Sequence, residues 1–186
     1  MKQHSIVVIG NGISRKNIDL WQLKKHYIVY GCNAIYREYQ PDILFCVDDR
    51  MCNELHVSGY SKVHTVITPN KYSCPSATHI KINSNWKKWN CGSLAVLYAC
   101  QKNPKNVYLA GFDVKYSNGK YKNIYAGTAH YANQNSIEQR QVVEAEIKQL
   151  TYCFYEYPEI NFYRLYENNI PEWESISNLT HITTEI

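Results

Sequence analysis

Four residues near the start of the chain have types and spacing that suit anion binding. Gly10, Asn11, Gly12 and Ser14 lie between the β-branched run of residues 6–9 and a predicted helix. A glycine turn of this kind leaves backbone N–H groups and a helix N-terminus facing outward, which favours a phosphate or another anion. A plain tight turn between strand and helix fits the same residues, and the third glycine of the dinucleotide-binding pattern is missing. The turn alone therefore leaves both interpretations open.

Adjacent carboxylates at Asp48 and Asp49 raise the question of a metal site. Because the pair has no intervening residue, we favour an N-cap followed by a first-turn carboxylate, each stabilising a helix N-terminus. Six histidines show no metal-ligand spacing: His4, His26, His56, His64, His79 and His181. We therefore expect no metal at these histidines or at the two aspartates.

Composition indicates one globular unit spanning residues 1–186. The chain is 45% hydrophobic and carries a net charge of +4, with its Lys and Arg residues spread out rather than clustered. We therefore expect one substantial core and no dedicated nucleic-acid surface. The first apolar run is too short for a signal-peptide core or a membrane span. The seven cysteines are odd in number and include no CxxC pair, which favours reduced thiols and a cytoplasmic protein.

Predicted strands and helices alternate along the chain. The patterns favour helices at 17–26, just after Asp49 through Leu55, 91–103 and 136–155, with Ser136 as N-cap of the last. Residues 116–121 favour a hairpin around the Asn118-Gly119 turn. Strands are expected at 6–9, 27–33, 43–47, 62–68, 79–82, 106–113 and 161–165, the last of which is expected to end the ordered core.

This alternation predicts the α/β class, as a single Rossmann-like domain. Continuous apolar strands indicate a mostly parallel sheet with helices on both faces. Ligands of such sheets bind beyond the carboxyl ends of the strands. The glycine turn, Asn33, Asp48 and Asp113 each follow a predicted strand. We therefore expect them to share one edge of the sheet.

Four motifs in order resemble a known family. These are "GNGIS", "CNAIY", "CGSLAVLYACQKNPKNVYLAGFD" and "YSNGKY". Together, over about residues 6–165, they resemble the bacterial sialyltransferases of the Campylobacter lipooligosaccharide type. Those enzymes transfer sialic acid from CMP-sialic acid to a sugar hydroxyl. A more distant resemblance reaches motility accessory and pterin pyrophosphokinase-like proteins. Both resemblances imply a nucleotide ligand.

The resemblance implies nucleotide-binding roles for residues in these motifs. Asn11 would lie against the donor phosphate region, and Asn33 would contact the nucleoside, since amides both donate and accept hydrogen bonds. Cys91 and Gly92 stand where the family has a Ser-Gly pair at the start of its helix. Lys88 stands where the family has an arginine near the substrate, although a solvated surface lysine is the plainer interpretation.

It also implies catalytic roles. Tyr116 and Tyr121 flank their turn as two family tyrosines do, where the hydroxyls hold the departing nucleotide phosphate. His130 is the candidate general base, because imidazole titrates near neutrality. The pair His130 and Tyr131 also matches a histidine-tyrosine pair upstream of the family's base. In that alignment the base is missing and Gln134 stands nearest its position.

Two departures leave the function open. The lid at about 114–135 is shorter than in the family, and we expect no counterpart of the family's basic membrane-associating tail. The leading hypothesis is a glycosyltransferase with a nucleotide-activated donor, such as a CMP-sugar, and no metal cofactor. The alternatives are a nucleotide-binding protein without transfer chemistry and a pyrophosphokinase-like or hydrolytic enzyme. The sequence shows no interface signature, so a homo-oligomer is neither predicted nor excluded.

Overall fold

The central feature of the fold is an eight-stranded sheet in which every neighbouring pair of strands is parallel. The computed structural model describes residues 5–82, 88–114, 116–117, 120–121, 123–131, 137–166 and 170–183. The strand order is β10-β9-β6-β1-β2-β3-β4-β5. The strands are β1 (Ser5–Ile9), β2 (Ile28–Cys32), β3 (Ile43–Phe45), β4 (Val66–Thr68), β5 (Thr78–His79), β6 (Asn106–Ala110), β9 (Asn161–Arg164) and β10 (Leu179–His181).

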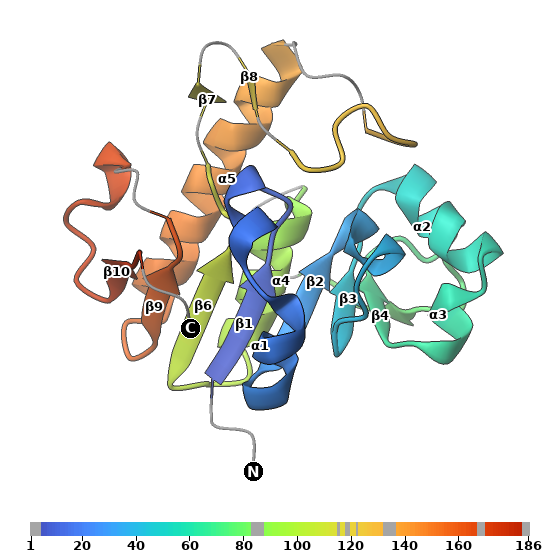
Figure 1. The fold of residues 1–186 in the computed structure, drawn as a ribbon, viewed down its shortest axis with the longest axis horizontal. Coiled ribbons are helices and arrows are strands. Elements are labelled where there is room, and N and C mark those ends of the chain that lie inside the picture. The colour runs from blue at the N-terminus through green and yellow to red at the C-terminus, as the bar shows by residue number, and fades with distance from the viewer. Residues whose placement is uncertain are drawn as a thin grey trace.

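Helices cover both faces of this sheet, as predicted (Figure 1). The α-helices are α1 (Leu20–His26), α2 (Asp49–Val57), α3 (Tyr60–Val63), α4 (Cys91–Cys100) and α5 (Ile137–Glu156). Short 3-10 helices are η1 (Ile13–Asn17), η2 (Asn33–Arg37) and η3 (Pro171–Trp173). The fold is a single Rossmann-like α/β domain, as the alternation of patterns indicated.

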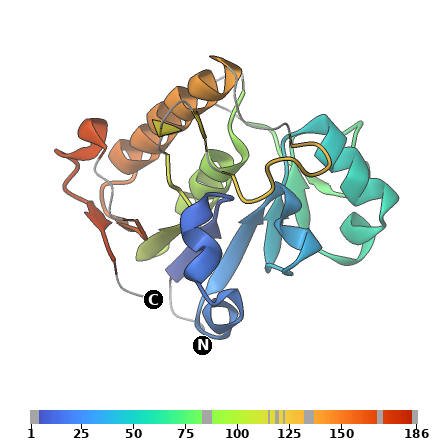
Figure 2. The ribbon, with the colours of Figure 1, turned by 45° about the horizontal axis from the view of Figure 1, so that its top comes forward.

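Alternate residues of β1 enter two separate hydrophobic cores. Ile6 and Val8 pack with α4 and α5, whereas Val7 and Ile9 pack with residues of α1, η2 and α2. Side chains of a strand point alternately to opposite faces, so a strand buried on both sides must be apolar at every position. All five residues of β1 are buried. Figure 2 shows α4 and α5 together on one side of the sheet.

The structure corrects the predicted end of the ordered core. The strand at 161–165 does not end it, because β10 pairs with β9, with Leu179 opposite Phe162. Ile170, Trp173 and Ile176 are buried on the way. The strand predicted at 62–68 is also shorter, because the helix α3 extends to Val63, whose side chain is exposed.

The hairpin predicted at residues 116–121 is confirmed. β7 (Tyr116–Ser117) and β8 (Lys120–Tyr121) form an antiparallel hairpin, whose Asn118-Gly119 turn lies outside the described residues, as does Ser136 before α5. All seven cysteines are free and buried. Within the described ranges, no helix combines the length and the apolar character needed to cross a membrane.

Candidate functional site

The residues predicted to share one edge of the sheet do so. Gly10 follows β1, Asn33 follows β2, Asp48 follows β3 by a few residues, and Asp113 follows β6. Because these strands are parallel, their carboxyl ends meet at the same edge. Residues 123–131, gold in Figure 1, lie above this edge between α5 and α2. Ile124 N donates to Asn11 O at 2.9 Å, which ties that segment to the glycine turn.

The glycine turn is hydrogen-bonded to the end of β6 and to the residue after it. Gly10 N donates to Ala110 O and Gly12 N donates to Gly111 O, both at 2.8 Å. A β-carbon at Gly12 would lie 2.5 Å from Gly111 O and 2.6 Å from the Asp113 carboxylate, so only glycine fits. Packing against the loop after β6 therefore accounts for a glycine at position 12.

A carboxylate of the protein itself, that of Asp113, binds the start of η1. The Asp113 carboxylate accepts from Ser14 N at 3.1 Å and also from the Ser14 hydroxyl. The expectation that this turn presents free N–H groups to a phosphate is therefore wrong for Gly10, Gly12 and Ser14. Asp113 takes the place at the short helix that we had expected an anionic ligand to take.

Amide oxygens at the ends of β1 and β2 have no hydrogen-bond partner in the part of the chain that the structure describes. Asn11 is only 8% exposed, and its Nδ2 donates to Cys32 O at 3.1 Å. Among the described residues, neither Asn11 Oδ1 nor Asn33 Oδ1 has a hydrogen-bond partner, although both atoms are buried. Asn33 adopts a φ of +51°, which asparagine tolerates better than most residues. Buried polar atoms without partners are rare, and a ligand hydroxyl would satisfy these two.

Cys91 and Gly92 begin α4 beside these amides. The Cys91 thiol donates to Phe45 O at 3.0 Å, and burial raises its pKa well above the ordinary value. The thiol is therefore a neutral, internally bonded group. A β-carbon at Gly92 would lie 2.9 Å from the Phe112 ring, so glycine allows the loop after β6 to approach α4. The hydroxyl of the next residue, Ser93, is buried without a partner among the described residues.

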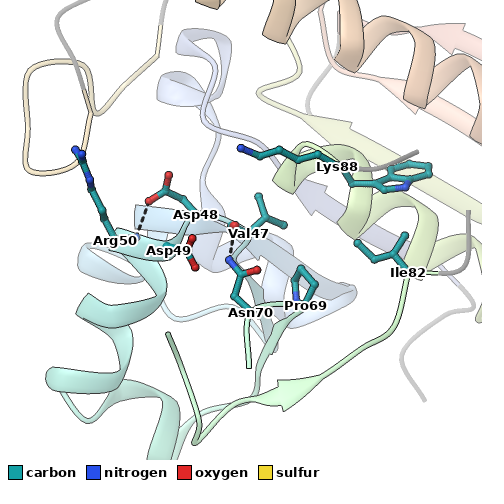
Figure 3. Close-up of a pocket in the computed structure, with 9 residues that line it drawn as sticks. Val47, Asp48, Asp49, Arg50, Pro69, Asn70, Ile82 and Lys88 are labelled. Carbon is teal, nitrogen blue, oxygen red and sulfur yellow. Dashed lines mark hydrogen bonds between the residues drawn. The ribbon is translucent and has the colours of Figure 1, made fainter. Parts of the chain in front are cut away.

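Lys88 lines a cavity of about 530 Å³ beyond the ends of β3 and β4 (Figure 3). In Figure 3 its side chain extends across the cavity toward Asp48, while Asp49 and Asn70 line the opposite wall. The Asn70 amide is fixed by a 2.6 Å hydrogen bond to Val47 O. Two carboxylates and two cations line the cavity, which balances its charge. Its full lining consists of Val47, Asp48, Asp49, Arg50, Pro69, Asn70, Ile82, Lys88 and Trp89.

The prediction that Asp48 and Asp49 belong to a helix start is confirmed. Asp48 is the N-cap of α2 and accepts from Arg50 N at 3.0 Å and Met51 N at 3.1 Å. Asp49 lies in the first turn and accepts from the Ser73 hydroxyl at 2.6 Å. Within the described residues, no group of three or more His, Cys, Asp or Glu side chains could hold a metal.

His130 contacts a carboxylate of α2. Its Nε2 lies 3.1 Å from Glu54 Oε2, and its backbone has a φ of +67°. Arg37 donates to both oxygens of Glu54 and also to Ala129 O, which fixes the backbone beside His130. Although burial favours the neutral acid, the hydrogen bonds from Arg37 and Tyr36 lower the pKa of Glu54. An ionised Glu54 can therefore accept a hydrogen bond from the Nε2–H group of His130.

The remaining predicted residues are only partly described. Tyr116 and Tyr121 are opposite each other in the β7–β8 hairpin, but their side chains lie outside the described part, as does Gln134. Next to His130, the Tyr131 hydroxyl accepts from Ala34 N at 3.4 Å, one residue after Asn33. Burial raises the pKa of Tyr131, so its hydroxyl stays protonated.

Sequence patterns did not single out Glu146 of α5 or Arg164 of β9, although both are buried beside this site. Glu146 lies three residues after Val143 and four before Leu150, on the buried face of α5. A charged residue on an apolar helix face was the signal that could have identified it. Arg164 follows the apolar residue Phe162 by two positions in a strand, which is the same kind of signal.

Comparisons with known proteins support the fold. No family model and no curated protein matches this sequence. Among solved structures, the chain is similar to a point mutant of the Campylobacter alpha-2,3/8-sialyltransferase CstII, with a TM-score of 0.52 and 16% identity. The alignment covers 89% of this chain and 83% of that one. At this identity the likeness shows a shared sialyltransferase-like fold.

Proposed function

We propose that this protein is a glycosyltransferase that transfers a sugar from a nucleotide-activated donor, a CMP-sugar, to an acceptor hydroxyl. The observation that carries the proposal is the pair of buried amide oxygens of Asn11 and Asn33 at adjacent strand ends, for which the described residues supply no partner. They stand at the edge where Rossmann-like sheets bind nucleotides. The likeness of the fold to a sialyltransferase, over most of both chains, supports a sugar nucleotide in particular.

Binding of the donor would use the amides and α4. Asn11 Oδ1 and Asn33 Oδ1 would accept hydrogen bonds from nucleoside hydroxyl or amino groups. The phosphate would lie at the first turn of α4, where Asn90 provides no side-chain cap. The tyrosines of the β7–β8 hairpin would donate to the phosphate as it departs.

The acceptor would bind in the cavity in front of α2. A balanced set of charged side chains with Asn70 suits the hydroxyl groups of a neutral sugar, and the volume of about 530 Å³ lies in the range of small-ligand sites. Arg50 at its rim is one helical turn before Glu54, which holds His130. His130 Nδ1 would take the proton as the acceptor oxygen attacks the anomeric carbon, and the bond to the CMP oxygen would break with inversion.

The test is release of CMP from CMP-sialic acid in the presence of a panel of acceptor sugars. We expect release above the buffer rate, and a loss of about 100-fold or more in the His130→Asn variant. Arg140→Gln, a change on the exposed part of α5, is the matched control. Undiminished release with chelator present would support a metal-free reaction. No release with any acceptor would contradict the proposal.

One observation favours a second candidate, a nucleotide-binding protein without transfer chemistry. The buried Cys91 thiol donates a hydrogen bond to Phe45 O. It is therefore not available to hydrogen-bond a ligand as a serine hydroxyl at this position would. Calorimetry with CMP and cyclic nucleotides separates the two functions. Tight binding of CMP together with absence of turnover would support the binding protein.

A further inference from the structure

One face of α5 holds the segment that leads into α4. Val142 O accepts from Asn90 Nδ2 at 2.8 Å, and Gln149 Oε1 accepts from Asn90 N at 2.9 Å. Gln149 Nε2 in turn donates to Lys88 O at 2.9 Å. Glu146 lies between Val142 and Gln149 on the same face, since residues three and four apart are neighbours on a helix. Val142 and Gln149 hold Asn90 and the backbone of Lys88 by these hydrogen bonds. Glu146, between them, faces the start of α4.

The Glu146 side chain is buried, and the described residues give it no hydrogen-bond partner. The residue is 8% exposed, and no hydrogen bond or ion pair joins its side chain to the part of the chain that the structure describes. A β-carbon at Gly92 would lie 3.5 Å from Glu146 Oε1. Burying a carboxyl group without a hydrogen bond is costly. A polar ligand at the first turn of α4 would remove this cost.

Charged groups reach Glu146 from two other elements. Asp113 approaches from the loop after β6, and Arg164 approaches from β9. Arg164 donates to Phe112 O and Asp113 O, both at 2.7 Å, and its Nη1 lies 3.5 Å from His181 Nδ1 on β10. The first turn of α4 itself contains no charged residue. Burial first, and then Asp113, raise the pKa of Glu146 to about 7, although Arg164 opposes them.

We propose that Glu146 is a proton donor that contacts the ligand: its neutral carboxyl hydrogen-bonds a phosphate oxygen held at the first turn of α4, and phosphate binding is therefore coupled to proton uptake. The proposal takes the identity of the ligand, a nucleotide, from the proposed function. Two observations support an anion at this place. Asn90 leaves the N–H groups of the α4 N-terminus without a side-chain cap, and the Ser93 hydroxyl beside them is unpartnered within the described residues. An ionised Glu146 would repel the same phosphate.

The test is the affinity for CMP methyl ester as a function of pH, measured by calorimetry. This phosphodiester keeps a constant charge near neutrality, so any pH dependence comes from the protein. For the wild type we expect the affinity to fall by up to about tenfold per pH unit above pH 7. Glu146→Gln should bind with no such dependence. Glu144→Gln, an exposed position on the same helix, should behave like the wild type.

Other outcomes separate this proposal from the proposed function. Equal pH profiles for the wild type and Glu146→Gln would overturn the proton donor and leave nucleotide binding intact. If the ester fails to bind at any pH, sulfate is the second probe. Sulfate binding whose pH dependence requires Glu146 would support the proton donor and contradict the nucleotide. Failure of both probes would overturn both.

A measurement on the wild type avoids dependence on the variant's folding. The Glu146 carboxyl is titrated by ¹³C NMR with and without the bound probe. We expect the bound phosphate to raise the pKa of Glu146. An unchanged or lowered pKa on binding would overturn the proposal.

Discussion

Two neighbouring regions of the sheet edge differ in whether the described residues satisfy the hydrogen bonds of their polar groups. At the glycine turn after β1, the N–H groups of Gly10, Gly12 and Ser14 donate to the last residue of β6 and to the loop after it. Between β2 and α4, the oxygens of Asn11, Asn33 and Ser93 are buried without partners in the described residues. Folding alone satisfies the first region. In the second, the described residues supply no hydrogen-bond partner, so we expect changes in the first region to affect stability and changes in the second to affect affinity.

The largest expected effect is that of Gly12→Ala on stability. The new β-carbon would lie 2.5 Å from the backbone oxygen of Gly111 and 2.6 Å from the Asp113 carboxylate, which hydrogen bonds from Ser14 hold in place. We expect a loss of about 3 kcal/mol or more in the free energy of unfolding, measured in urea. Gly59→Ala is the control. Its site has a φ of +77° but no atom within 4 Å, so we expect a loss of only about 1 kcal/mol. Equal losses would contradict packing as the cause at Gly12.

Glu146 should make stability depend on pH. Its pKa is raised from 4.5 to about 7 in the folded protein, so its stabilising contribution is complete below pH 4.5 and is lost as the pH rises through 7. The total is about 3 kcal/mol. Urea unfolding at pH 5 and pH 8 should therefore show Glu146→Gln to be more stable than the wild type at the higher pH. Glu144→Gln should show no such gain. A wild type whose pH dependence matches that of Glu146→Gln would contradict the assignment.

Asp113→Asn should cost about 2 kcal/mol, because charge-assisted hydrogen bonds to Ser14 are lost in a buried place. Asp19→Asn offers a matched comparison. Asp19 caps α1 through Trp21 N and Gln22 N at an exposed position, where asparagine caps about as well as aspartate. Urea unfolding should therefore show almost no loss at Asp19. A loss at Asp113 as small as that would mean that the Ser14 contact contributes little.

The smallest effect should fall on affinity. Asn33→Gly keeps the positive φ of the backbone and removes the amide, so we expect stability close to that of the wild type and an affinity for CMP lower by about tenfold. Asn103→Gly, at a φ of +48° after the far end of α4, controls for the backbone change. Calorimetry and thermal unfolding give the two quantities. Unchanged affinity in Asn33→Gly would remove this amide from the site.

Much of the fold followed from local patterns. β1, α4 and β6 are buried almost throughout, so their apolar runs were unambiguous. β10 was missed because its residues are only partly buried or exposed and its strand is short. Such a strand is specified by its pairing with β9, which a local pattern does not contain.

The site was predictable only as far as topology determines it. Parallel strands place Gly10, Asn33, Asp48 and Asp113 at one edge, whatever their partners are. The partners themselves depend on packing between distant segments. Ser14 and Asp113 are 99 positions apart in the sequence. The hydrogen bond between them means that a side chain of the protein itself occupies the N–H group of Ser14. Glu146 lies near Gly92 at the start of α4 only because α5 packs against α4.

The central pairing of the sheet also has a kinetic consequence. β1 lies between β2 and β6, and Ser5 pairs with Asn106, 101 positions later. Because parallel strands are joined by long crossovers, the middle of the sheet closes late and the chain should fold slowly for its size. During synthesis, β1 to β4 emerge well before β6, and the edge of β1 that will receive it stays uncovered. Chaperones that shield exposed strand edges would therefore be most useful in that interval.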